Sequence, residues 1–171
     1  MKAVTLHGPW AWAVCHLGKN VKNRDWSHPP SPALIGQTIA IHAGSPATWT
    51  RANWLKVADV PVKWPKDVQY NNIWLHISAY VPRLAFSALS LRHDERDRFC
   101  SSVVATAVID RIEPPTAGPL YTGWRVNAHT GIYLRDVSVL QEPVKIPRGQ
   151  LGFWNLTPEQ EAAVVAAGRL A

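Results

Sequence analysis

The alternation of apolar and polar residues along the chain predicts a domain of short strands with helices around them. Period-two patterns and β-branched runs predict strands near residues 2–6, 22–26, 38–42, 103–113 and 131–140. Helical spacing after a proline or a serine predicts helices over residues 9–17, 45–58 and 158–167. Thr157 and Gln160 have the spacing of a capping box at the start of the last helix. Together these elements predict an α+β fold whose strand spacing suits a small barrel.

The remaining segments carry weaker patterns. Residues 72–91 are apolar without one clear period, and we expect helix on both sides of Pro82. Residues 92–99 alternate in charge, which is typical of a solvated turn or a helix end. Residues 143–156 form a further extended segment interrupted by a turn. No internal repeat or linker divides the chain, so a single domain over residues 1–171 is expected.

The composition is that of a globular protein. Hydrophobic residues make up 47% of the 171 residues and charged residues 18%, which excludes a disordered chain. No apolar run reaches the roughly 20 residues of a membrane-spanning helix, and the first residues lack a signal-peptide pattern. A cytoplasmic location without a membrane partner is therefore expected. Cys15 and Cys100 predict buried free thiols. The seven histidines form no known ligand motif, so we expect no metal site and no cofactor.

Charge and tryptophan content narrow the class of partner. The formal net charge is +6 and the isoelectric point is about 9.6, which favours a polyanionic partner. Nine tryptophans are many for this length, and most are expected in the core because tryptophan has a large apolar surface. One or two that lie near cations are candidates for stacking on nucleobases.

The segment GKNVKNRDW, residues 18–26, concentrates these features. It holds Lys19, Lys22, Arg24 and Trp26, and it can be a solvated edge, as charged runs usually are. In a strand, however, residues 22, 24 and 26 share one face, which places two cations beside an indole ring. Arginine binds phosphate through a planar fork and tryptophan stacks on bases. We therefore favour a binding cleft over a solvated edge.

Four segments, taken in order, resemble the conserved boxes of a known family: HGPWAWAV, GKNVKNRDW, IAIHAG and RGQLGFWNL. The family is the ASCH domain family of the PUA-like superfamily, and the resemblance spans residues 4–156. It implies a small PUA-like β-barrel of mixed strands with peripheral helices. Residues 45–102 are long for the family, and we expect them to form a helical insertion that offers a surface for a protein partner.

The resemblance also implies a set of cleft residues. Matching the boxes position by position gives Pro9, Trp10, Lys19, Arg24, Trp26 and His42. His42 has two equal interpretations, a core histidine bonded to the backbone and a cleft residue. Trp10 and Trp12 lie on different faces of the predicted helix, and the resemblance places Trp10 near the cleft. Trp154 is expected in the core.

What the resemblance implies about function is nucleic-acid handling. Some members of the family are ribonucleases, and one small branch hydrolyses acetylated cytidine. Lys19 matches the family, but Lys22 stands where most members have a glutamate and that branch has a threonine. The further glutamate of that branch matches no position here. Like charges beside Lys19 are expected to lower its pKa, which would suit a base or a nucleophile.

Three hypotheses of function follow. The leading one is binding of RNA, or of a single-stranded or modified nucleotide, through Trp10, Lys19, Lys22, Arg24, Trp26 and His42. The alternative is a hydrolase that acts on RNA or a modified nucleoside, with Lys19 as the central catalytic residue. The third is a protein-interaction domain that uses residues 45–102, in which the cationic segment is incidental.

Overall fold

The computed structural model describes residues 1–25, 29–60, 67–70, 73–76 and 90–168. The predictions for Trp26 and for the helix C-terminal to Pro82 lie outside these residues. Among the described helices none is long and apolar enough to cross a membrane. Cys15 and Cys100 are free thiols, and Cys100 is buried.

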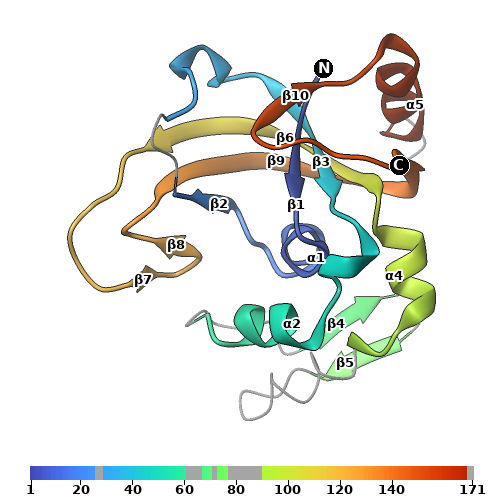
Figure 1. Cartoon of the computed structure of the whole chain (residues 1–171), viewed down its shortest axis with the longest axis horizontal. Helices are drawn as coiled ribbons and strands as arrows, with labels where there is room; N and C mark the ends of the chain where they lie inside the picture. The colour runs from blue at the N-terminus through green and yellow to red at the C-terminus, as the bar shows by residue number, and fades with distance from the viewer. Residues whose placement is uncertain (26–28, 61–66, 71–72, 77–89, 169–171) are drawn as a thin grey trace.

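A mixed sheet of six strands forms the centre of the described structure (Figure 1). Its strand order is β10-β1-β3-β6-β9-β2, in which β1 pairs in parallel with β3 and the other neighbours are antiparallel. The strands are β1 (Lys2–Leu6), β2 (Val21–Arg24), β3 (Thr38–Ala43), β6 (Ser102–Glu113), β9 (Thr130–Lys145) and β10 (Phe153–Asn155). The five predicted strands are therefore present, but β2 ends at Arg24 and not at residue 26, and β9 continues beyond its predicted end.

The sheet curls into a half-barrel. β1 and β2 are four places apart in the strand order, yet the Lys22 Nζ atom on β2 donates a hydrogen bond of 3.0 Å to the Thr5 carbonyl oxygen on β1. Three register shifts between β6 and β9 allow this curvature, because bulges increase the local twist of a strand pair. The fold is thus α+β with a partly closed barrel, as the sequence predicts.

Helix α1 (Gly8–His16) packs against β3, β6 and β9 on the concave side of the sheet. Trp12 is fully buried there, and its ring meets the ring of Trp54 edge-on at 5.4 Å. Gly8 is required at the start of the helix, because a Cβ atom would lie 2.8 Å from the Trp49 ring. Of the two tryptophans on different faces of the predicted helix, Trp12 is therefore the one that packs in the core.

The predicted helix over residues 45–58 is divided in two. A 3-10 turn, η2 (Pro46–Thr48), precedes helix α2 (Arg51–Ala58). The division falls at Thr50, whose side chain caps α2 by accepting a hydrogen bond of 3.2 Å from the Asn53 backbone N–H. This side-chain cap fixes the start of α2 at a residue that periodicity alone does not mark.

The described part of the insertion, residues 45–102, contains helices and a hairpin. Helix α4 (His93–Phe99) follows a two-stranded sheet of β4 (Asp67–Tyr70) and β5 (Ile73–His76). The prediction of helix in residues 72–91 is wrong for Ile73–His76, which pair as a strand. A short apolar run has no period that distinguishes a helix from a strand. Its pairing with β4 makes this segment a strand.

The chain ends in helix α5 (Pro158–Gly168), which packs against β9. Its capping box is confirmed: Thr157 and Gln160 exchange backbone-to-side-chain hydrogen bonds of 3.0 and 3.3 Å. Between β6 and β9 the chain forms a projecting arm, residues 114–129, visible beside β2 in Figure 1. The arm carries the short hairpin of β7 (Tyr121–Thr122) and β8 (Arg125–Val126), and a further 3-10 turn, η1 (Pro32–Leu34), precedes β3.

Candidate functional site

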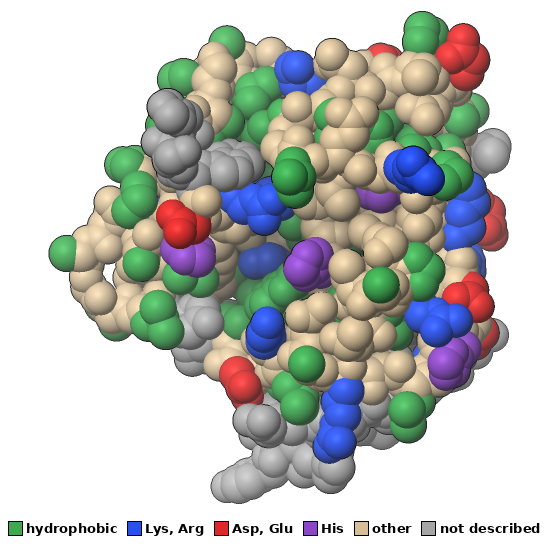
Figure 2. Space-filling model, viewed as in Figure 1, with side chains coloured by type: hydrophobic (Ala, Val, Ile, Leu, Met, Phe, Trp, Pro, Cys, Tyr) green, Lys and Arg blue, Asp and Glu red, His purple; other side chains and the backbone are tan. Residues whose placement is uncertain are grey.

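A cavity of about 270 Å³ opens between the end of β1, the start of α1, the β2 edge and the arm. Figure 2 shows the hollow in this face, with basic side chains inside it. The described lining residues are Thr5, Leu6, His7, Trp10, Lys19, Lys22, Asn23, Arg24, Val60, Trp124, Val126 and His129. The volume is near the lower limit of small-molecule pockets, which hold roughly 300–1,000 Å³. One nucleotide is therefore the largest nucleic-acid unit that suits it.

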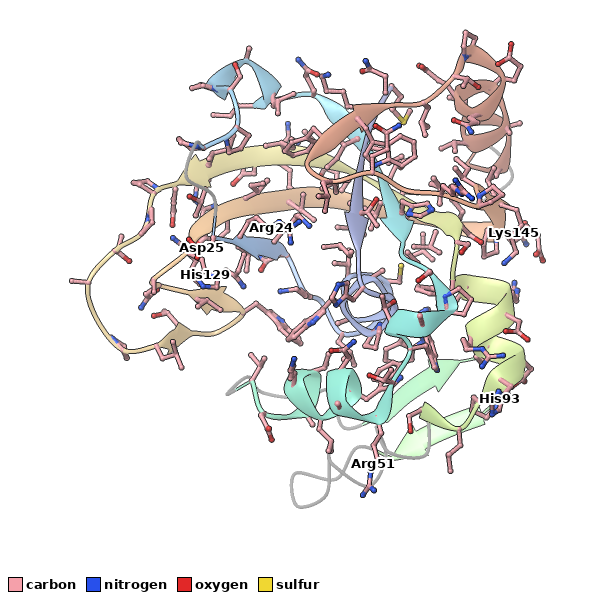
Figure 3. The ribbon with its side chains drawn as sticks, viewed as in Figure 1. Arg24, Asp25, Arg51, His93, His129 and Lys145 are labelled. Carbon is pink, nitrogen blue, oxygen red and sulfur yellow. The ribbon has the colours of Figure 1, made fainter. Side chains whose placement is uncertain are left out.

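The described lining is cationic and contains no carboxylate. Lys19 and Lys22 are only 4% and 6% exposed, whereas Arg24 is half-buried at the end of β2. Figure 3 shows Arg24 beside β2 and His129 on the arm. Positive charge is thus most deeply buried at Lys19 and Lys22, which define the inner end of the cleft. Solvent screens the charge least there.

Lys19 is brought into the cleft by the end of helix α1. Gly18 adopts a φ of +66°, and the backbone N–H of Lys19 turns back to the Ala13 carbonyl oxygen at 3.1 Å. A glycine with positive φ is a common helix terminator, because it reverses the chain without a steric cost from Cβ. The Lys19 Nζ atom then lies 5.1 Å from the Trp10 ring centroid and 5.0 Å from that of Trp124.

The two lysines differ in their partners. Lys22 uses one of its three N–H donors on the Thr5 carbonyl oxygen. Lys19 contacts the indole faces through cation–π interactions, and its Nζ atom has no hydrogen-bond acceptor among the described residues. When both lysines are protonated, five of their N–H donors therefore have no acceptor among the described residues and can bind a ligand.

Burial changes the proton affinity of both lysines. The pKa of Lys19 is lowered to about 7, first by loss of solvation and then by the charge of Lys22. The pKa of Lys22 is also lowered to about 7, by burial and by Arg24. The sequence predicted the direction for Lys19 from neighbouring charges alone, but burial is the larger cause. The pKa of His7 is lowered as well, by burial and then by nearby cations including Lys22.

The arm is fastened to β2 by one side-chain amide. Asn23 donates a hydrogen bond of 2.7 Å to the Trp124 carbonyl oxygen and accepts one of 2.9 Å from the Val126 N–H. Buried Arg125 donates to the carbonyl oxygens of Val126 and Pro114, which closes the base of the arm. These bonds fix the backbone from Trp124 to Val126, and the Trp124 ring faces Lys19.

His42 lies behind the cleft and not in its lining. It is 1% exposed on β3, and its Nε2 atom lies 2.9 Å from the Ile146 carbonyl oxygen. Its ring meets Trp154 edge-on, and Gly149 lies against it so closely that a Cβ would be 2.6 Å from the Nδ1 atom. Of the two interpretations, the core histidine bonded to the backbone describes this position.

The cleft thus brings together Trp10, Lys19, Lys22 and Arg24 from the predicted set. Pro9 is buried in the first turn of α1 and Trp26 lies outside the described residues. Sequence reasoning missed Trp124 and His129, which no local pattern distinguishes from other loop residues. In the described part of the chain, no three His, Cys, Asp or Glu side chains gather as a metal-ion site.

Comparison with known proteins gives similarity to solved structures at low sequence identity. No family model and no curated protein matches the chain. The crystal structure of ASCH from Zymomonas mobilis superposes with a TM-score of 0.50 at 14% identity, over 96% of this chain and 93% of that one. A serine-to-alanine mutant of the same Zymomonas mobilis protein gives a TM-score of 0.45 at 15% identity, over 96% and 94% of the two chains. The chain therefore has the ASCH fold that its four sequence boxes predict.

Proposed function

We propose that the protein binds single-stranded RNA, or a nucleotide exposed from a folded RNA, through this cleft. The observation that carries the proposal is the lining itself: three cations and two indole rings meet in one cavity whose described lining has no carboxylate. Lysine and arginine neutralise phosphate charge, and indole rings provide apolar contact for a base or a ribose.

The size of the cavity favours single strands over duplexes. A volume of about 270 Å³ admits one nucleotide, and the bases of a duplex are stacked and paired out of its reach. Sequence-specific RNA recognition mostly targets unpaired nucleotides for the same reason. The net charge of +6 adds a long-range attraction that speeds encounter with any polyanion.

The hydrolase alternative is supported by one specific observation. A buried lysine whose pKa is about 7 is partly unprotonated at neutral pH, so Lys19 could accept a proton or attack a carbonyl carbon. However, catalysis also needs a second group that orients this amine or exchanges protons with it. The described lining offers His7 and His129 for that role and no carboxylate. Acetylcytidine or labelled RNA left intact by the protein would exclude the alternative.

The proposal is tested by titrating the protein with a fluorescent oligouridylate and with an RNA duplex of the same length. We expect the single strand to bind more tightly, with an affinity that falls as salt rises by about 0.7 log unit per log of salt for each phosphate neutralised. Lys19→Met should remove most of this binding. Arg96→Ala, which removes a cation paired with Asp97 on α4, is the control and should not. Equal loss in both variants, or equal binding of the duplex, would contradict the proposal.

A further inference from the structure

The inner end of the cleft is built for an oxygen anion rather than for a base. Lys19 and Lys22 together present five N–H donors without described protein acceptors, and both line the same cavity. The Lys19 ammonium group already lies over the faces of Trp10 and Trp124, at about equal distances from the two centroids. A base therefore cannot stack between these rings without displacing the lysine.

The burial of the cations along the cleft also favours an anion at its inner end. The two lysines at the inner end are almost completely buried, while Arg24 is half-buried and His7 is exposed. Among the described residues that line the cavity, no carboxylate balances the buried pair. Buried charge is costly unless it is paired, so a bound anion would recover solvation energy that the free protein lacks.

We infer that the inner end of the cleft binds the terminal phosphate monoester of an RNA strand, held by Lys19 and Lys22. The inference rests on the proposed function and specifies which part of the strand enters. A terminal phosphate is joined to the chain on one side, so it can enter a small cavity while the strand leaves past Arg24 and the arm. An internal phosphodiester continues on both sides and carries one negative charge, whereas a monoester carries about −1.5 to −2 at pH 7 and three acceptor oxygens.

The titration of the lysines adds a signature that base binding lacks. Because burial has lowered the pKa of both amines to about 7, a bound dianion should raise these values again and draw protons from solution. Among the described residues, the other titratable or charged groups that line the cavity with the pair are His7 beside α1, Arg24 on β2 and His129 on the arm. Of these, His7 could also take up a proton on binding, because burial and nearby cations lower its pKa in the free protein.

The experiment compares three oligouridylates of one length on the full-length protein: one with a 5′-phosphate, one with a 3′-phosphate and one with hydroxyl groups at both ends. We expect one phosphorylated strand to bind at least about tenfold more tightly than the hydroxyl strand. Which end gives the advantage identifies the source of the phosphate. The advantage should shrink between about pH 6 and about pH 8.5, and calorimetry in two buffers of different ionisation enthalpy should detect proton uptake.

Variants separate this inference from the proposed function. Lys19→Met and Lys22→Met should lose the phosphate advantage, and the Arg96→Ala control should keep it. If all three strands bind equally well to the unmodified protein, the inference is wrong while the proposed function stands. If none of them binds, the proposed function itself fails. Because the comparison of strands needs no variant, a substitution that disturbs folding does not weaken the test.

Discussion

The lysines of the cleft and the arginines of the outer surface differ in whether they have a carboxylate partner. On β6 the Arg111 guanidinium contacts Asp110 at 2.7 Å and Glu113 at 2.8 Å. At the start of α4, Arg92 contacts Asp94 at 2.6 Å and lowers the pKa of that carboxyl group to about 2. In the described cleft lining, Lys19 and Lys22 have no carboxylate at all. These two outer arginines have carboxylate partners, and the two buried lysines have none in the described lining.

This difference separates structural charge from charge that is available to a ligand. An exposed ion pair contributes roughly 0–1 kcal/mol to stability and presents little net field, because solvent and the partner both screen it. A buried ammonium group without a counterion keeps its field and loses its solvation, as the lowered pKa of Lys19 records. The unpaired lysines of the empty cleft therefore lower the stability of the protein, whereas the paired outer arginines do not. A bound anion should for this reason gain more free energy from the lysines than from the arginines.

The largest effect is expected when the cleft is given a counterion of its own. Val126 lines the cavity on the arm, and Val126→Glu would place a carboxylate near the lysine pair. Like charges brought together at an interface cost several kcal/mol, so this variant should bind RNA at least about 100-fold more weakly than Val126→Gln. Val126→Gln is the matched control, because it has the same shape without the charge. Similar affinities of the two variants in a binding titration would show that the anion does not reach this part of the cavity.

Removal of one inner cation should have the next largest effect. A hydrogen bond to a charged group contributes about 1.5–3 kcal/mol, so Lys19→Met should weaken RNA binding about 10- to 150-fold. Arg111→Ala removes an outer cation and should change the affinity by less than about twofold, because its charge is already paired. Circular dichroism should show that both variants are folded. If the two substitutions weaken binding equally, net charge alone attracts the RNA.

The stability of the free protein should depend on pH in a way that reports the unpaired lysines. Their pKa is about 7 in the folded protein and near 10.5 in the unfolded chain. Between these values the unfolded chain binds more protons, so the free energy of unfolding rises with pH, by at most about 1.4 kcal/mol per pH unit for each lysine. Below about pH 7 both states are protonated, and the full cost of burying the charge is present.

Lys19→Met isolates this contribution. The variant should be more stable than the unmodified protein near neutral pH, and the difference should shrink as the pH approaches about 10. Urea unfolding at several pH values measures it. Arg96→Ala is the control, and its small effect should not vary over this range. A constant difference between Lys19→Met and the unmodified protein would mean that Lys19 is not buried as a cation.

Much of the fold could be predicted because its long strands have strong local patterns. β6 and β9 are rich in β-branched residues, and the capping box of α5 is visible in the four residues from Thr157 to Gln160. The hairpin of β4 and β5 was missed because Ile73–His76 is short and apolar, and only its pairing makes it a strand. β7 and β8 have two residues each, which is too few for any periodicity.

The cleft could be predicted only as far as its residues lie in one motif. Lys19, Lys22 and Arg24 are neighbours in the sequence, and α1 holds Trp10 beside them. Trp124 comes from a segment about a hundred residues later, and the bonds from Asn23 that place it have no counterpart in a local pattern. His42 is the opposite case. The segment IAIHAG is easily recognised in the sequence, yet its histidine is bonded to the backbone behind the cleft and does not line it.

The smallest effect expected concerns the rim of the cleft, where the two kinds of cation are most alike. Arg24 is half-buried and lines the cavity, whereas Arg135 on β9 is exposed and pairs with Asp136 and Asp110. Arg24→Ala should lower the RNA affinity modestly and reduce the slope of log affinity against log salt by about 0.7, the loss of one phosphate contact. Arg135→Ala should leave the slope unchanged and alter the free energy of unfolding by less than about 1 kcal/mol. Titrations at several salt concentrations, together with thermal melting, measure both. An unchanged slope in Arg24→Ala would place Arg24 with the outer cations and confine the anion site to the two buried lysines.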